Sequence, residues 1–352
     1  MTRADLTVRG GGIFGLSIAY AAVLQGARVR LIETVRIGAG SSGGVVGALS
    51  PHVPEAWNAK KEFQLDSLLM AADWWAGVEA ASGLPSGYAR LGRLQPLGDD
   101  RAVAAAQARA LTAQTLWRGQ AIWQVIAASG DAWQPASPTG LLIHDTLSAR
   151  LHPRLAAQSL LAAITALGGS ITDDPTHHGP VIWATGTAGL ADLTADLGRP
   201  AGTGIKGQAA LLRHEARDQP HLFIDGLHIV PHADGTVAIG STSENRWSDP
   251  TSTDSQLERL IDTARAVLPA LAKAPVIERW AALRPRAPSR APLLGPWPGR
   301  PGHYIANGGF KIGFGMAPKI AEVMADLLLR GIDAIPPEFH TDALAEEKPA
   351  RR

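Results

Sequence analysis

Apolar and polar positions divide the start of the chain into a strand, a helix and a second strand. Leu6 and Val8 form a short apolar strand, and the apolar positions from Ile13 to Leu24 are spaced as in a buried helix. Residues 29–32 form a second apolar strand, which ends at Glu33. This order predicts a parallel strand–helix–strand unit at the N-terminus.

The same reading predicts further elements along the chain. Helices are expected at 58–82, 101–115, 153–167, 254–267 and 318–330. Strands are expected at 141–145, 181–184, 208–212, 222–224, 228–230 and 237–240. Segments typical of a nucleotide-binding domain therefore alternate with segments of another kind, which favours two interleaved domains over two consecutive ones.

The fold class that follows is α/β. A Rossmann-type domain is interleaved with a smaller α+β domain, which is built on a mainly antiparallel sheet. The first domain is predicted to comprise residues 1–84, 141–205 and 283–352, and it binds the nucleotide. The second is predicted to comprise residues 85–140 and 206–282, and it binds the substrate.

The turn between the first strand and the helix carries a phosphate-binding pattern. Gly10, Gly12 and Gly15 satisfy G-x-G-x-x-G. The first glycine allows a tight turn, the second lets the backbone approach a pyrophosphate, and the third lets the helix close on the strand. Glu33 is placed to accept the ribose hydroxyls, and an acid there disfavours the 2′-phosphate of NADP.

Composition excludes several classes of protein. The 352 residues include 33 basic and 32 acidic side chains, which argues against a strongly basic nucleic-acid surface. There is no cysteine, so disulfides, cysteine metal sites, thiol catalysis and cysteine-linked flavin are excluded. No apolar run reaches the length of a membrane span, and the first strand leaves no room for a signal peptide. We expect a cytoplasmic enzyme with no metal site, in which His177 and His178 lie in a solvated loop.

Five stretches together resemble the FAD-dependent oxidoreductases of the D-amino-acid oxidase and glycine oxidase type. They are VRGGGIFGLSIAY with Glu33, the Gly/Ser loop ending GALSP, VIWATG at 181–186, IKGQ at 205–208 with HIVPHADGTVAIGSTSE at 228–244, and WAALRPRAPSRAPLLGP at 280–296 with NGGFKIGFGMAP at 307–318. The resemblance implies non-covalent FAD as the cofactor.

The resemblance also implies which residues contact FAD. The glycine turn, with Ile13 and Phe14, would hold the pyrophosphate. The remaining cofactor residues would be Ser41, Ser42 and Gly43 in a phosphate loop, Gly47, Ala48 and Leu49 beside the flavin ring, Ala184, Thr185 and Gly186 in a second turn, and Gly308, Gly309, Phe310, Lys311, Ile312 and Gly313 in a third. A helix start after this last turn suits the negative charge of reduced flavin.

Three residues are implied at the substrate. Arg284 matches the family arginine that binds the substrate carboxylate, for which a planar guanidinium is well suited. His228 stands where related proteins often carry a tyrosine, and Lys311 where some carry another basic residue. One departure concerns the adenine end of FAD: residues 169–181 have room only for a brief connection, so we expect the family's β-hairpin there to be shortened or missing.

The function implied is oxidation of glycine, sarcosine or a D-amino acid to the imine by hydride transfer to flavin, with dioxygen as the acceptor. The expected partner is this small amine, with no nucleic acid and no membrane span; a homo-oligomer is compatible with the sequence. Two alternatives stay open. The loop GSSGGVVGALSP is similar to that of tRNA wobble-uridine-modifying oxidoreductases, and the chain could be a flavin-binding subunit of a dehydrogenase complex.

Overall fold

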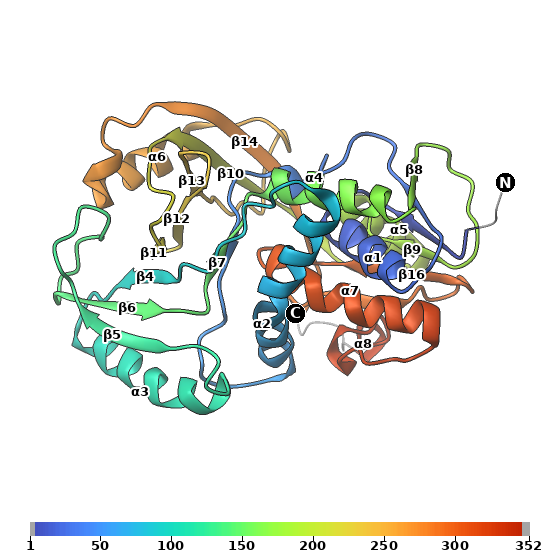
Figure 1. Cartoon of the computed structure of the whole chain (residues 1–352), viewed down its shortest axis with the longest axis horizontal. Coiled ribbons are helices and arrows are strands. Elements are labelled where there is room, and N and C mark those ends of the chain that lie inside the picture. The colour runs from blue at the N-terminus through green and yellow to red at the C-terminus, as the bar shows by residue number, and fades with distance from the viewer. Residues whose placement is uncertain (1–3, 347–352) are drawn as a thin grey trace.

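In the computed structural model, which describes residues 4–346, two large sheets lie side by side (Figure 1). The first has six strands in the order β15-β16-β9-β1-β2-β8, and all neighbours are parallel except β15 and β16. Its strands are β1 (Leu6–Arg9), β2 (Val29–Ile32), β8 (Ser170–Thr172), β9 (Val181–Trp183), β15 (Leu293–Pro296) and β16 (His303–Asn307).

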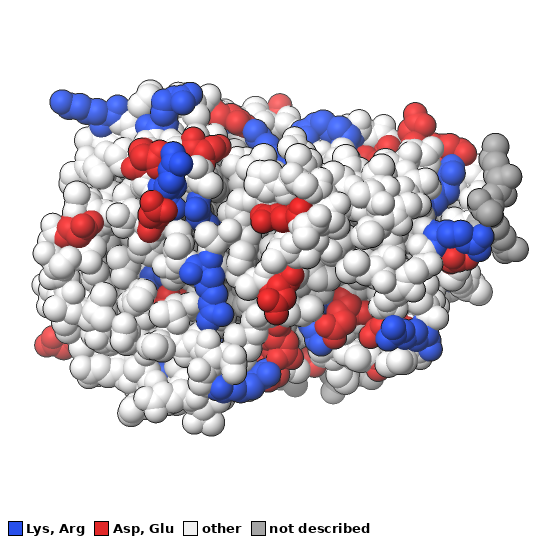
Figure 2. All heavy atoms as spheres, in the orientation of Figure 1, with Lys and Arg blue, Asp and Glu red and all other residues white. Residues whose placement is uncertain are grey.

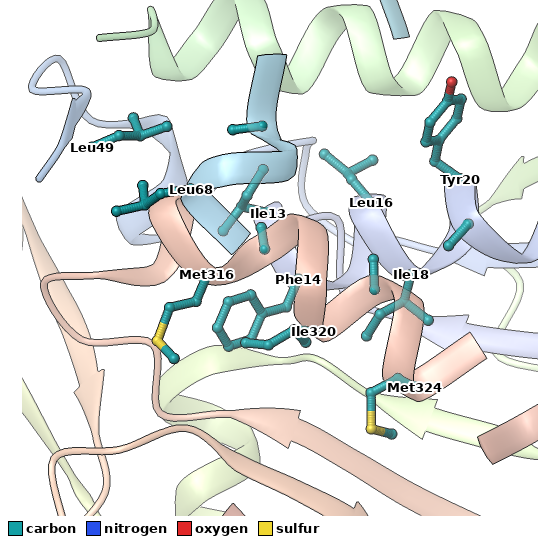
Figure 3. Packing of buried hydrophobic residues seen from close by; sticks show 14 of the residues in the cluster. Ile13, Phe14, Leu16, Ile18, Tyr20, Leu49, Leu68, Met316, Ile320 and Met324 are labelled. Carbon is teal, nitrogen blue, oxygen red and sulfur yellow. The ribbon is translucent and has the colours of Figure 1, made fainter. Parts of the chain in front are cut away.

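Four helices pack together beside this sheet and share one hydrophobic core with it. They are α1 (Ile13–Leu24), α2 (Ala59–Ser82), α4 (Pro153–Ala166) and α7 (Gly313–Arg330). Helix α1 is apolar on every side, and residues 13–23 are all buried, because strands and helices surround it. Figure 3 shows Phe14 and Ile18 of α1 among Met316, Ile320 and Met324 of α7.

The second sheet has eight strands in the order β14-β10-β13-β12-β11-β4-β6-β5, and only β11 and β4 run parallel. Its strands are β4 (Arg93–Pro96), β5 (Trp123–Ala127), β6 (Leu141–Asp145), β10 (Thr203–Arg213), β11 (His221–Ile224), β12 (Leu227–Pro231), β13 (Thr236–Gly240) and β14 (Val276–Arg286). Helix α3 (Asp100–Leu116) packs against β5, and α6 (Ser255–Val267) packs against β10, β12 and β13.

Smaller elements connect the two sheets. Strands β3 (Ala48–Leu49) and β7 (Ala149–Arg150) form a two-stranded ladder, and α5 (Gly186–Leu197) contacts β10, β14 and β16. The remaining elements are the 3₁₀ turns η1 (Ser41–Gly43), η2 (Pro269–Leu271) and η3 (Pro337–Phe339) and the short helix α8 (Ala343–Glu346).

The α/β class with an antiparallel second sheet is confirmed, and three local features differ from or extend the prediction. Helix α7 begins at Gly313, five residues before its predicted start, so Pro318 lies inside the helix. Pro318 is the sixth residue of α7, so it removes the backbone donor of one i→i−4 hydrogen bond in the second turn. Helix α5 and several strands were not predicted, namely β3, β4, β5, β7, β8, β14, β15 and β16. Between β8 and β9, residues 173–180 form no strand, so the connection contains no hairpin.

The predicted domain limits remain a proposal. Strand β6 pairs with β4 and β5 in the large sheet, although the predicted limit at 141 assigned it to the cofactor domain. If the domains follow the sheets, as we propose, this limit lies after Asp145. The ends of the predicted ranges, residues 1–3 and 347–352, lie outside the described residues.

Candidate active site

A cavity of about 710 Å³ collects residues from both sheets. At one end it is lined by the glycine turn after β1 and by Glu33, and at the other by Arg284, His228 and Lys311. The sequence therefore identified both ends. Seventeen of the predicted cofactor residues line it: Gly10, Gly12, Ile13, Phe14, Glu33, Ser41, Ser42, Gly47, Ala48, Ala184, Thr185, Gly186, Gly308, Gly309, Phe310, Lys311 and Gly313.

Four predicted cofactor residues lie outside the lining, and each has a structural place. A Cβ on Gly15 would lie 1.9 Å from the carbonyl oxygen of Gly10, so this glycine lets α1 close on the turn. A Cβ on Gly43 would lie 2.2 Å from the carbonyl oxygen of Gly38. Leu49 is buried in the core, and Ile312 is the residue before α7.

The nucleotide end is built mainly from backbone. Gly10 has φ of +104°, and a Cβ there would lie 2.5 Å from the carbonyl oxygen of Ala184. The Ser42 hydroxyl accepts from the Ile13 amide at 3.0 Å, which fixes the loop over the start of α1. The Glu33 carboxylate accepts from the Gly11 amide at 2.7 Å. The N-terminal amides of α1 and this acid form a suitable site for a pyrophosphate and a ribose.

The second and third turns are joined by a buried asparagine. Asn307 donates to the carbonyl oxygen of Gly186 at 2.8 Å, and its own side-chain oxygen accepts from the Gly308 amide at 2.8 Å. The Thr185 hydroxyl between them is buried, has no partner among the described residues, and belongs to a cavity-lining residue. A buried hydroxyl without a partner fits a cavity that receives a polar ligand, so these residues are compatible with FAD.

The loop of residues 41–49, here called the flavin loop, is anchored by Arg154 on α4 and by His232, which follows β12. A Cβ on Gly47 would lie 1.9 Å from the carbonyl oxygen of Leu151, so only glycine fits at position 47 of the loop. The His232 Nε2 donates to the carbonyl oxygen of Val45 at 2.9 Å, and Arg154 donates to that of Gly43 at 2.9 Å. Burial, followed by the charge of His152, lowers the pKa of His232 to about 4, so the ring is neutral at pH 7.

Arg284 is held at the substrate end by the two residues that follow β13. It lies on β14 opposite Ile205 of β10, and its guanidinium donates to the Ser241 hydroxyl at 2.6 Å and to the carbonyl oxygen of Thr242 at 3.2 Å. A Cβ on Gly207 would lie 1.8 Å from Nη1, so this glycine provides the space for the guanidinium. Burial lowers the pKa of Arg284 to about 10, and the charge of Glu244 opposes this. At pH 7 the Arg284 guanidinium is therefore still protonated, although it is largely shielded from water in the cavity wall.

His228 of β12 faces the same end of the cavity. Its ring lies 4.7 Å from that of Phe223 and 5.8 Å from that of His221 (centroid to centroid). Burial lowers its pKa to about 3, and the charges of Arg93, Lys311 and Arg284 act in the same direction. The ring is therefore neutral, and its Nδ1 has no partner within residues 4–346.

Lys311 supplies a second cation beside Arg284. Its side chain is exposed and lines the cavity, and its Nζ lies 5.8 Å from the ring centroid of Phe310. Desolvation and then the charge of Arg284 lower the pKa of the Lys311 ammonium. Two cations and one neutral imidazole suit an anionic ligand.

Several cavity residues were not singled out from the sequence. Ser241, which contacts Arg284, follows β13, and Trp280 and Leu283 lie on β14 within a stretch that was recognised only for its arginine. Arg9 and Trp183 line the opposite end. The only signal for Arg9 was a charged residue at the end of an apolar strand.

Two remaining expectations concern metals and membranes. Among residues 4–346, no group of three or more His, Asp or Glu side chains could hold a metal ion. His177 instead contacts Arg9, with 2.7 Å between Nε2 and Nη1. None of the helices in this range combines the length and apolar character needed to cross a bilayer.

Comparisons with known proteins identify the family. Residues 5–327 match the model of the family described as FAD dependent oxidoreductase. A glycine oxidase of Pseudomonas aeruginosa is 36% identical over 125 residues, which are 35% of this chain and 34% of that protein. A bifunctional protein ThiO/ThiG of a Nostoc species is 27% identical over 97% of this chain and 55% of its own length. The chain thus spans a third to about half of these relatives.

A solved structure has the same fold. The crystal structure of glycine oxidase from Geobacillus kaustophilus superposes with a TM-score of 0.82 at 21% identity, covering 97% of this chain and 98% of the other. The family match extends over the glycine turn, the flavin loop and the arginine strand. This protein therefore belongs to the FAD-dependent oxidoreductase family, and FAD is its cofactor.

Proposed function

We propose that this protein oxidises the α-carbon of a small amino acid or secondary amine acid, such as glycine, sarcosine or a D-amino acid. The substrate loses a hydride from the α-carbon and a proton from the nitrogen, which leaves an imine. Water then hydrolyses the imine to an oxo acid and an amine. Bound FAD supplies the hydride acceptor, and dioxygen receives the two electrons and two protons to give hydrogen peroxide.

The observation that carries this proposal is the anchored guanidinium of Arg284. A buried arginine that already donates to Ser241 and Thr242 is oriented before the ligand arrives, so little entropy is lost when a carboxylate binds. The related proteins named above include glycine oxidases, whose substrate has such a carboxylate. We assign the substrate carboxylate to Arg284.

His228 and Lys311 have separate roles in the same proposal. The neutral imidazole of His228 offers a ring nitrogen as acceptor for an N–H of the substrate amine, without adding positive charge. The nearby cations Arg284 and Lys311 favour the neutral amine over the ammonium. The Lys311 ammonium lies near the flavin end of the carboxylate site and stabilises negative charge on the substrate or on reduced flavin.

The cofactor contacts are proposed in the same way. The amides at the start of α1 would hold the pyrophosphate, Glu33 the ribose, and the flavin loop and the start of α7 the ring system. Phe223, His228 and Arg284 all line the cavity, and the α-carbon would lie beside them.

An anaerobic titration tests the reaction. Purified protein is mixed with glycine, sarcosine and small D-amino acids, and flavin bleaching is followed without oxygen. Peroxide is then measured in air. We expect bleaching by at least one such acid and none by its decarboxylated amine. Equal bleaching by the decarboxylated amine would contradict the carboxylate site, and bleaching without peroxide would contradict dioxygen as the acceptor.

Transfer RNA serves as the second arm of this experiment. Lys and Arg are mixed with Asp and Glu on the face shown in Figure 2, and that face has no field of one sign. Phosphate recognition needs such a field and makes binding steeply dependent on salt. Bleaching by tRNA alone, suppressed by salt, would replace the amine by a nucleic acid as substrate.

A further inference from the structure

The adenosine end of the cavity has a wall that the glycine motif does not supply. Arg9 ends β1 and Trp183 ends β9, and the two residues are partners in the register of this parallel pair. Both line the cavity, as do Glu33, Thr34 and Val35 after β2. Because the pyrophosphate belongs at the start of α1 and the ribose at the acid after β2, the base of the nucleotide has to lie near this wall.

Arg9 is held in place from two sides. Its guanidinium carbon lies 4.6 Å from the ring centroid of Trp183, and Nη1 lies 2.7 Å from the His177 Nε2. Trp183 is itself fixed, because its indole donates to the His303 Nδ1 at 2.9 Å and its ring lies 5.7 Å from that of Trp297. A stacked guanidinium is a flat, weakly hydrated surface, which is well suited to cover a purine ring.

The segment before β9 does not contribute to this wall. Residues 173–180 form an irregular connection, and none of them lines the cavity. His177 acts from behind, through its contact with Arg9. The surface available to the base is therefore formed by the side chains at the ends of β1 and β9 and by the residues after β2.

We propose that Arg9, stacked on Trp183, forms the adenine subsite for FAD, with the guanidinium plane against the purine. This accounts for a charged residue at the end of an otherwise apolar, buried strand. The proposal depends on FAD as the cofactor and not on the amine substrate, so it stands or falls independently of the reaction proposed above.

Ligand titrations of the flavin-free full-length protein test the subsite. FAD and ADP contain adenine, whereas FMN contains flavin and a single phosphate without adenosine. We expect Arg9→Leu to raise the dissociation constants of FAD and ADP about ten-fold, as loss of one stacked base contact does, and to leave that of FMN within about two-fold. Trp183→Leu should act in the same direction. Flavin fluorescence reports FAD and FMN, and calorimetry reports ADP.

Two further variants separate stacking from charge and from packing. Arg9→Lys keeps the positive charge but loses the planar fork, so we expect FAD to remain weakened; full recovery would indicate a phosphate contact and overturn the proposal. Arg300→Leu is the matched control. The Arg300 guanidinium carbon lies 4.6 Å from the ring centroid of Trp297 and 5.8 Å from that of Trp183, but Arg300 does not line the cavity. Its FAD affinity should be unchanged. Equal losses for FAD and FMN in Arg9→Leu would also overturn the proposal.

Discussion

The two ends of the cavity are built in different ways. The nucleotide end relies on backbone: amides at the start of α1, three close-packed turns, and glycines whose missing Cβ atoms allow contacts such as that of Gly10 with Ala184. The substrate end relies on side chains from β12, β14 and the turn before α7, which are far apart in the sequence. The proposed cofactor site therefore depends on backbone conformation, whereas the proposed substrate site depends on the charge and burial of side chains.

The largest expected effect breaks the nucleotide end. Gly12→Asp would place a carboxylate at the N-terminus of α1, where the anionic pyrophosphate has to bind. We expect the variant to purify without FAD and therefore without yellow colour, as measured by absorbance near the flavin maximum. Gly98→Asp is the matched control, because Gly98 is exposed and a Cβ there meets nothing within 4 Å. A yellow Gly12→Asp protein would contradict the phosphate site.

The next effect tests whether the substrate end depends on the position of one charge. Arg284→Ala should lower kcat/KM about ten- to a hundred-fold, because a hydrogen-bonded charge pair contributes about 1.5–3 kcal/mol. Gly207→Ala should reproduce much of this loss with Arg284 still present, since the new Cβ takes the position of the guanidinium. The flavin spectrum should be retained in both. Normal kcat/KM in Gly207→Ala would show that the guanidinium can act from another position.

A third prediction concerns His232, which anchors the flavin loop through the carbonyl oxygen of Val45. The folded state holds His232 with a pKa of about 4, against 6.5 for an unfolded chain. Between these values the unfolded chain binds the proton and the folded chain does not, so stability is complete above pH 6.5 and decreases as the pH falls toward 4. The full shift corresponds to about 3 kcal/mol.

Urea unfolding from pH 4.5 to 7 measures this slope. His232→Gln should flatten it, whereas His144→Gln on β6, which contacts Gln124 away from the flavin loop, should not. An unchanged slope in His232→Gln would exclude His232 as its source.

The smallest expected effect is that of replacing a second arginine on β14, which can be compared directly with Arg284. Arg279 lies on β14 with an exposed guanidinium, whose Nε is 2.7 Å from the Glu258 carboxylate. Exposed pairs of this kind contribute about 0–1 kcal/mol. Arg279→Gln should leave kcat/KM within about two-fold and change the free energy of unfolding by less than about 1 kcal/mol. A large loss of activity would show that the strand carries substrate charge beyond Arg284.

The sequence predicted the nucleotide end better than the substrate end for a physical reason. A strand, a glycine turn and a helix are local, so Gly10, Gly12 and Gly15 carry their own explanation. Arg284 was recognised by resemblance, but nothing local indicates that Ser241 orients it or that Gly207 makes room for it. Both contacts arise from the pairing of β10 with β13 and β14, and the residues in contact lie 43 and 77 positions apart in the sequence.

Some helices and strands were missed or misplaced because they too depend on contacts with distant parts of the chain. Strands β4 and β5 are short, and their pairing with β6 depends on partners outside their own sequence. The start of α7 was placed too late because Pro318 resembles a helix start, although Gly313 occupies that position. The mainly antiparallel second sheet and the absent hairpin after β8 follow from pattern and length, whereas α5, β14, β15 and β16 were missed.

The way the chain passes between the two sheets has an evolutionary consequence. In the sequence, β8 and β9 of the first sheet lie between β6 and β10 of the second. Strands β15 and β16 of the first sheet follow β14, the last strand of the second. No contiguous fragment holds either sheet alone, so recombination cannot exchange one half as a cassette. With this connectivity, we expect a change of substrate to come from point substitutions around β12 and β14, while the turns proposed to hold the cofactor are kept.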